Sequence, residues 1–198
     1  MAATMLIALP AAALAKKERT NIKVNYATIF DSPHDVVLGN LHGNVTIVEF
    51  FDYNCGDCKH ALPGMMKLLQ TDPNLRFVLK EFPILGQGSV GAAHVAVAAR
   101  MQSPTGTKYI EFHQKLLGGH GTAGKTRALA VAKEVGFDMG QLMKDMDGDE
   151  VKTTIAEDLR LADTLGIEGA PSYVVGDEVV FGELGYDELA RKIAALRR

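Results

Sequence analysis

One stretch constrains this chain more than any other: a run of β-branched and aromatic residues that leads directly into a Cys-x-x-Cys sequence. The run covers residues 46–51, and the cysteines are Cys55 and Cys58, the only two among 198 residues. Such a run predicts a strand buried on both faces, and the apolar residues after it recur at the spacing of a helix. The stretch therefore predicts a strand, a short turn and a helix that begins at the cysteine pair.

Their position at the start of a helix should make the cysteines reactive. A cysteine at the start of a helix meets free backbone N–H groups and the positive end of the helix dipole, which both favour the thiolate. Cys58 follows one turn later, close enough to close a small disulfide ring with Cys55, so we predict a redox-active pair. A structural disulfide is one alternative, although so short a loop constrains the unfolded chain very little. The other is a copper or zinc module that uses Cys55, Cys58 and His60, although a structural zinc site needs about four ligands.

Composition narrows the class of protein. A hydrophobic content of 47% with 23% charged residues is typical of a soluble globular protein, and the length suits one domain. The formal net charge of −3 gives no reason to expect nucleic acid or an anionic membrane as a partner. No apolar run approaches the ~18–20 residues that a membrane-spanning helix needs.

The N-terminus shows only part of the pattern of an export signal. Residues 5–15 form a short apolar run that ends in Ala13-Leu14-Ala15, which matches the core and cleavage site of a secretory signal, but the basic segment before it is missing. We interpret residues 1–15 as a truncated signal peptide, 16–38 as an N-terminal extension and 39–198 as the folded domain of a periplasmic protein. The alternative is an apolar N-terminal helix on a cytosolic protein.

The remaining pattern predicts an α/β fold. Strands are expected at about 36–38, 45–51, 75–82, 172–175 and 178–181. The second and third flank the cysteine helix, so they should form a parallel pair with a right-handed crossover, and Gly176-Asp177 marks a hairpin between the last two. Residues from about 88 to 166 have a helical pattern. The order predicts a thioredoxin-like fold, a central mixed sheet flanked by helices, with an inserted helical subdomain.

Three motifs carry a family resemblance: Phe50–Lys59, Leu79–Gly86 and Gly169–Tyr173. Together they resemble the DsbA family of thiol:disulfide oxidoreductases, and the pattern is closest to its branch of ScsC-like and DsbG-like bacterial proteins. The similarity extends from about Val36 to the C-terminus. The three motifs in this order, separated by a helical block of the right size, are far more specific than Cys-x-x-Cys alone.

The resemblance implies an enzyme that exchanges disulfides with unfolded or cysteine-containing proteins through its Cys-Gly-Asp-Cys sequence. Cys55, at the helix start, is expected to be the nucleophile and Cys58 the resolving cysteine. A membrane redox partner would oxidise or reduce the pair, with no dissociable cofactor and no metal. Whether the enzyme is an oxidase, a reductase or an isomerase stays open. We expect a monomer, because about twenty polar N-terminal residues cannot form the long helix or stalk of oligomeric relatives.

Two charged residues interrupt the predicted strands. Glu49 stands six residues before Cys55, and a buried carboxylate is costly unless it is partnered or protonated. The resemblance implies that Glu49 is the family's buried acid, which assists proton transfer at the inner cysteine. Lys80, central in the adjacent strand, is expected to be its counter-ion. In the alternative interpretation Glu49 faces water at an edge position and Lys80 is solvated.

The residues around the pair complete the expected site. The resemblance implies a cis-proline at Pro171 that faces the cysteines, the alternative being a trans proline that opens a strand. The backbone of Ala170 would then pair with a substrate peptide as an added strand. Many relatives have Thr or Val at that position, which leaves substrate preference open. Gly56 and Asp57 are expected to tune the pair, since the Asp57 charge disfavours the Cys55 thiolate and makes a weaker oxidant.

Overall fold

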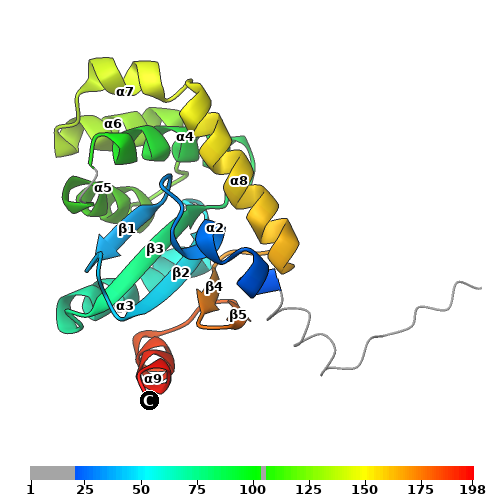
Figure 1. Ribbon diagram of the computed structural model, residues 1–198. Helices are drawn as coiled ribbons and strands as arrows, with labels where there is room; N and C mark the ends of the chain where they lie inside the picture. The colour runs from blue at the N-terminus through cyan, green and yellow to red at the C-terminus, as the bar shows by residue number, and fades with distance from the viewer. Residues whose placement is uncertain (1–20, 104–105) are drawn as a thin grey trace, which may run out of the picture.

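A five-stranded mixed sheet forms the centre of the protein (Figure 1). The computed structural model describes residues 21–103 and 106–198. The strands are β1 (Val36–Gly39), β2 (Val45–Phe51), β3 (Leu75–Glu81), β4 (Ser172–Val175) and β5 (Glu178–Phe181), in the order β1-β3-β2-β4-β5. β2 and β3 run parallel, and the other neighbouring pairs are antiparallel. The predicted α/β fold with a parallel pair around the cysteine helix is confirmed, and β1 lies at one edge of the sheet.

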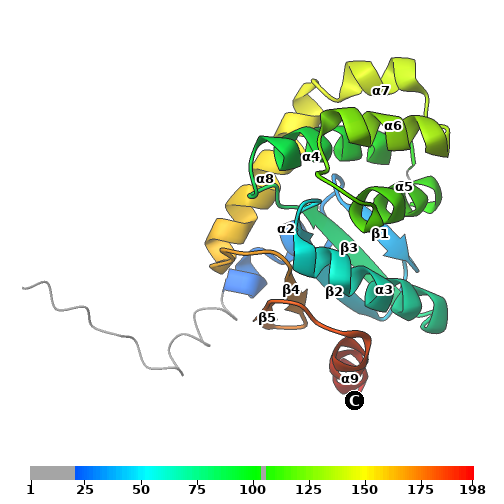
Figure 2. The same ribbon diagram turned by 180° about the vertical axis from the view of Figure 1, so that it is seen from behind.

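Helices cover both faces of the sheet, so the central strand β2 is buried on each side. On the face in front in Figure 2, α3 (Gly56–Thr71) packs over the sheet and contacts α9 (Tyr186–Leu196). On the face in front in Figure 1, α2 (Tyr26–Phe30) and the last turns of α8 (Asp149–Leu165) cover the sheet. Because successive side chains of a strand point to opposite faces, odd-numbered residues of β2 face α3 and even-numbered residues face α2.

The predicted helical insertion lies between β3 and β4. It consists of α4 (Gln87–Met101), α5 (Thr107–Gly118), α6 (Lys125–Val135), α7 (Met139–Asp145) and α8. Asp138 caps α7 by accepting a hydrogen bond from the Gln141 N–H at 3.0 Å. Both views show α4 to α7 gathered beyond one end of the sheet, while α8 runs back beside it (Figures 1 and 2). The insertion therefore adjoins the end of β2 from which the cysteine helix starts.

The segment predicted as an extension is partly built into the domain. Ile29 and Phe30 of α2 are buried against Val48 and Phe50 of β2, so this part of the chain covers the sheet rather than leaving it. The helix α2 has no clear periodic signal because it is only five residues long. The predicted signal peptide, residues 1–15, lies outside the described residues, as do residues 16–20. Among the residues that are described, no helix has the length and hydrophobicity needed to cross a membrane.

Candidate active site

The two cysteines lie at the start of α3, as predicted, but in different surroundings. Cys55 is the N-cap residue of the helix, and its sulfur accepts a hydrogen bond from the Cys58 N–H at 3.1 Å. Its residue surface is 7% exposed, whereas Cys58 is fully buried. Both are free thiols in this structure. A partner sulfur can therefore approach Cys55 but not Cys58.

The same surroundings separate the acidities of the two thiols. The hydrogen bond from the Cys58 thiol, helped by the backbone N–H groups of Cys58 and Asp57, lowers the pKa of Cys55 from 9.0 to about 7. Burial and the negative charge of Asp57 oppose this shift. The hydrogen bond to Cys55, followed by burial, raises the pKa of Cys58 well above its ordinary value. Near neutral pH, Cys55 thus carries a substantial thiolate fraction and Cys58 stays protonated.

The loop before β4 meets the cysteines from the other side. The peptide bond between Ala170 and Pro171 is cis, so the trans alternative is wrong. The Cys55 thiol donates a hydrogen bond to the Ala170 carbonyl oxygen at 3.1 Å, across 115 residues of sequence. The antiparallel pairing of β4 with β2 brings this loop to the end of the strand from which Cys55 follows. Three sequence-predicted site residues therefore meet at one point: Cys55, Ala170 and Pro171.

Glu49 lies below the cysteine helix and is buried, with 3% of its surface exposed. It is an odd-numbered residue of β2 and therefore faces α3. Its hydrogen bond comes from the Tyr173 hydroxyl at 3.4 Å, and burial raises the pKa of Glu49 from 4.5 to about 8. The charge of Glu49 in turn raises the pKa of Cys58. The water-facing alternative is wrong, and the carboxyl group is electrostatically coupled to the inner cysteine.

Lys80 corrects the sequence analysis, because it is not the counter-ion of Glu49. In the parallel register Glu49 is opposite Leu79 and Lys80 is opposite Phe50, so the two charges point to opposite faces of the sheet. The Lys80 ammonium lies 2.6 Å from an Asp35 carboxylate oxygen and 3.6 Å from one of Asp158. It is buried, so the solvated alternative is also wrong.

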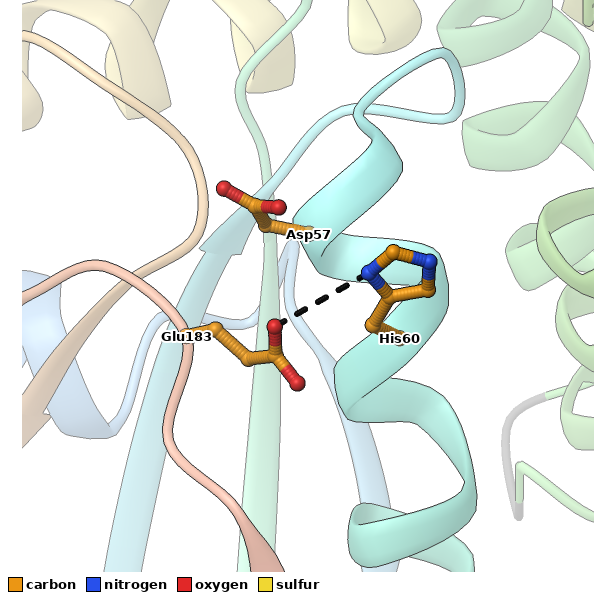
Figure 3. A group of neighbouring side chains, drawn as sticks. All are labelled: Asp57, His60 and Glu183. Atoms are coloured by element: carbon orange, nitrogen blue, oxygen red, sulfur yellow. Dashed lines mark ion pairs between the residues drawn. The ribbon is translucent and has the colours of Figure 1, made fainter.

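Gly56 and Asp57 lie on the exposed first turn of α3. Figure 3 shows Asp57 and His60 projecting from this helix toward Glu183, which lies in the segment between β5 and α9. Ligand atoms of these three residues lie within 4.8 Å of one another, and His60 Nδ1 is 3.9 Å from a Glu183 carboxylate oxygen. Among the described residues, Cys55 and Cys58 do not join His60 in such a group. The predicted metal alternative is therefore not assembled here.

A buried polar network near the site was not predicted from the sequence. The Tyr53 hydroxyl lies 3.0 Å from the Tyr109 hydroxyl and 3.3 Å from His113 Nδ1, and the Tyr109 hydroxyl donates to Glu81 at 3.2 Å. Burial raises the pKa of Glu81 and lowers that of His113 to about 3. Glu81 has the same signal as Glu49, a carboxylate in an apolar strand. The other three look like ordinary packing residues in the sequence.

The geometry agrees with what the chain resembles. The model of the DSBA-like thioredoxin domain family matches residues 46–194. A thioredoxin-like oxidoreductase from Silicibacter pomeroyi DSS-3 is 44% identical, with a TM-score of 0.82 over 87% of this chain and 98% of that one. The thiol-disulfide exchange protein alpha-DsbA2 from Wolbachia pipientis is 27% identical, with a TM-score of 0.85 over 94% of this chain and 100% of that one.

A longer protein contains a similar stretch. The Na(+)/H(+) antiporter NhaA 1 of Salinispora arenicola is 26% identical over 165 residues, which are 83% of this chain and 25% of the antiporter. The chain thus spans about a quarter of the length of that curated relative. The family match covers both cysteines, both central strands and the loop at Pro171. The chain therefore belongs to the family of DSBA-like thioredoxin domains.

Proposed function

We propose that the protein is a thiol–disulfide oxidoreductase that exchanges disulfides with polypeptide substrates, with Cys55 as the nucleophile and Cys58 as the resolving cysteine. The observation that carries this proposal is the contrast within the pair. Cys55 is partly exposed and has a pKa of about 7, while Cys58 is fully buried and has a raised pKa. The two structural relatives, an oxidoreductase and a thiol-disulfide exchange protein, support the same chemistry.

In the oxidising direction the pair starts as a disulfide. A substrate thiolate attacks the Cys55 sulfur, a mixed disulfide forms, and Cys58 leaves as a thiolate. A second substrate thiolate then attacks the substrate sulfur of the mixed disulfide, which yields the substrate disulfide and releases the Cys55 thiolate. Two electrons have passed from the substrate to the pair, and a membrane redox partner removes them. The reverse sequence reduces a substrate, and Cys58 then resolves the mixed disulfide.

Glu49 is the proposed proton partner of Cys58. A group with a pKa of about 8 exchanges protons readily near neutral pH, and Glu49 is buried on the face that carries the cysteine helix. It gives a proton to the departing Cys58 thiolate and takes one when Cys58 becomes the attacking thiolate. Ala170 is the proposed backbone partner of an extended substrate segment, because its carbonyl already accepts a hydrogen bond from the reacting thiol. Gly56 and Asp57 tune the pair, and Lys80 has no part in this scheme.

The proposal extends to the setting of the enzyme. We propose an exported, periplasmic monomer, on the basis of the apolar N-terminal run and the short polar segment after it. The cysteine pair itself carries the electrons, so no dissociable cofactor enters the scheme. Light scattering over a range of concentrations tests the monomer, and a trimer or tight dimer at every concentration would contradict it.

Trapping the intermediate tests the roles of the two cysteines. Cys58→Ala removes the resolving thiol, so we expect it to accumulate a mixed disulfide with a reduced, unfolded protein substrate in the presence of a small disulfide. Cys55→Ala should form none. Alkylation of the reduced wild type near neutral pH should also modify Cys55 well before Cys58. An adduct on Cys58, or alkylation of Cys58 first, would reverse the assigned roles.

A further inference from the structure

The loop between α5 and α6 lies beside the cysteine pair. It covers residues 119–124, three of which are glycines, and is here called the glycine-rich loop. Together with the start of α3 it borders an open pocket of about 510 Å³. The lining comes from both parts of the fold: Tyr53, Asn54, Cys55, Gly56, Lys59, Leu85, Leu117, Gly119, Gly121 and Thr122. It shares no residue with the second pocket, of about 500 Å³, which surrounds Ala170 and Pro171. The mixed disulfide at Cys55 would therefore have a separate pocket beside it.

The Asn54 side chain ties the end of this loop to the cysteine segment. The Asn54 carboxamide oxygen accepts a hydrogen bond from the Ala123 N–H at 2.7 Å, and its NH₂ group donates to the Ala123 carbonyl at 2.8 Å and to the Ser89 hydroxyl at 2.9 Å. All three bonds therefore reach the helical insertion. Asn54 is itself held, because its backbone N–H donates to the Asp52 carboxylate at 2.8 Å. The residue next to the nucleophile thus joins the two parts of the fold.

We propose that Asn54 is a positioning residue, which fixes the glycine-rich loop as the wall of a pocket for the substrate segment next to the reacting cysteine. This inference rests on the proposed function. A polypeptide attached to Cys55 has chain on both sides of its sulfur, and one side has to pass the pocket that borders Cys55. Leu85 and Leu117 line this pocket and offer that segment apolar contacts. A small disulfide such as glutathione disulfide has much less chain to place there.

Substrate binding should weaken if the glycine-rich loop is no longer held in place. Glycines give a loop many backbone conformations, so holding the loop in one of them is entropically unfavourable. The Lys59 ammonium also donates to the Gly119 carbonyl and the Arg127 guanidinium to the Gly121 carbonyl at 2.8 Å, so the end of the loop around Ala123 is the part that Asn54 holds. If the loop spends only part of its time in the pocket-forming conformation, the apparent affinity for a substrate falls by that fraction. Loss of the three Asn54 bonds should therefore raise KM about three- to tenfold.

The chain offers a matched control for the test. Asn40 also bridges two backbone groups: its NH₂ group donates to the Pro73 carbonyl at 2.9 Å, and its oxygen accepts from the His42 N–H at 2.9 Å. It follows β1 and lies near Leu75, at the opposite end of β3 from the site. Asn54→Ala and Asn40→Ala therefore make the same chemical change in two places. The quantity to measure is kcat/KM for insulin reduction divided by the rate constant with glutathione disulfide.

We expect KM for insulin to rise about three- to tenfold in Asn54→Ala and the ratio to fall by a similar factor. Asn40→Ala should keep the wild-type ratio. Ser89→Ala, which removes one of the three bonds, should lower the ratio about twofold and serves if Asn54→Ala does not fold. Amide hydrogen exchange at Ala123 should speed up in Asn54→Ala, because its N–H loses its acceptor.

Two results would overturn the inference. One is an unchanged ratio in Asn54→Ala, or in Ser89→Ala if that variant alone folds. The other is an equal fall in Asn40→Ala, which would show that the ratio follows general stability. Unchanged amide hydrogen exchange at Ala123 would also contradict the inference, because it would show that Asn54 does not hold this part of the loop. A wild type that reacts with neither insulin nor glutathione disulfide would instead refute the proposed function, and it is recognised before any variant is made.

Discussion

Glu49 and Lys80 carry the same signal in the sequence, a charge inside an apolar strand, yet they lie in very different places. They sit on neighbouring parallel strands one register position apart, and the pleat sends them to opposite faces. Glu49 has one hydrogen bond, at 3.4 Å from the Tyr173 hydroxyl. Lys80 has two carboxylates and the Thr28 carbonyl, at 2.8 Å, around its ammonium. A buried charge with a full set of partners holds a fold together, whereas a sparsely partnered one is suited to exchange a proton.

The pKa values alone do not distinguish Glu49 from the two carboxylates around Lys80. Burial raises the pKa of Asp158 to about 8 and that of Asp35 to about 6, while Lys80 opposes both shifts. Glu49 also has a pKa of about 8. What differs is the neighbour: the Glu49 charge acts on Cys58, and the Asp158 charge acts on Lys80, Asp35 and the strand end at Glu81. Position, more than acidity, divides a reactive acid from a structural one.

The largest effect is expected from Lys80→Met, which tests whether Lys80 has a structural role. It leaves two buried carboxylates without their cation, and breaking such a group typically costs about 3–5 kcal/mol of stability. Urea unfolding at pH 7 measures the loss. Arg76→Met, on the same strand, removes a pair with the exposed Asp31 and should cost less than about 1 kcal/mol. Slower disulfide exchange per folded molecule in Lys80→Met would show that the far face takes part in the chemistry.

The pH dependence of stability sharpens the comparison for Glu49. Its pKa is raised from 4.5 to about 8 on folding, so the stability that its protonated form contributes is fully present below about pH 4.5 and is lost as the pH rises through about 8. The wild type should therefore weaken relative to Glu49→Gln by up to about 1.4 kcal/mol per pH unit over this range. Unfolding titrations of both proteins measure the difference, in which Asp158 and Asp35 cancel. A constant difference from pH 5 to 8 would mean that Glu49 stays charged.

The same Glu49→Gln variant should slow disulfide exchange about 100-fold, the lower end of the range for general acid–base catalysis. The amide keeps the shape of the acid but cannot carry the proton that Cys58 gains or loses. The turnover of insulin reduction measures the effect, and Glu178→Gln, on the exposed end of β5, is the control. Full activity in Glu49→Gln would remove Glu49 from the mechanism and make it a structural residue like Lys80.

The smallest effect concerns Asp57. Its charge raises the pKa of Cys55 while its backbone N–H lowers it, so Asp57→Asn should remove only the unfavourable part. Because Asp57 is exposed, we expect a change of at most about 1 kcal/mol, which is about 20 mV toward a stronger oxidant. Asp57→His should go further in the same direction. Glutathione buffers measure the potential, and a Cys55 pKa that stays constant or rises would contradict the prediction.

The sequence predicted more of the fold than of the site's surroundings, for physical reasons. The bounds of β2, α6, β4 and β5 follow from local signals, such as the apolar run before Cys55 and the glycine after Val135. Glu49 stands out because a lone carboxylate in such a run needs an explanation. The partner of Lys80 was predicted wrongly because the strand register decides which face a residue occupies. Asn54 gives no local signal, since its partner Ala123 is 69 residues away.

The strand order has a consequence for how the chain is made. β2, which leads to the cysteines, pairs on one side with β3, which follows soon after, and on the other with β4, which comes only after the whole helical insertion. Until β4 has been synthesised, β2 is an edge strand with unpaired backbone groups. The Ala170 carbonyl that accepts the Cys55 hydrogen bond is also absent until then. A growing chain thus carries both thiols for more than a hundred residues before the rest of their site exists.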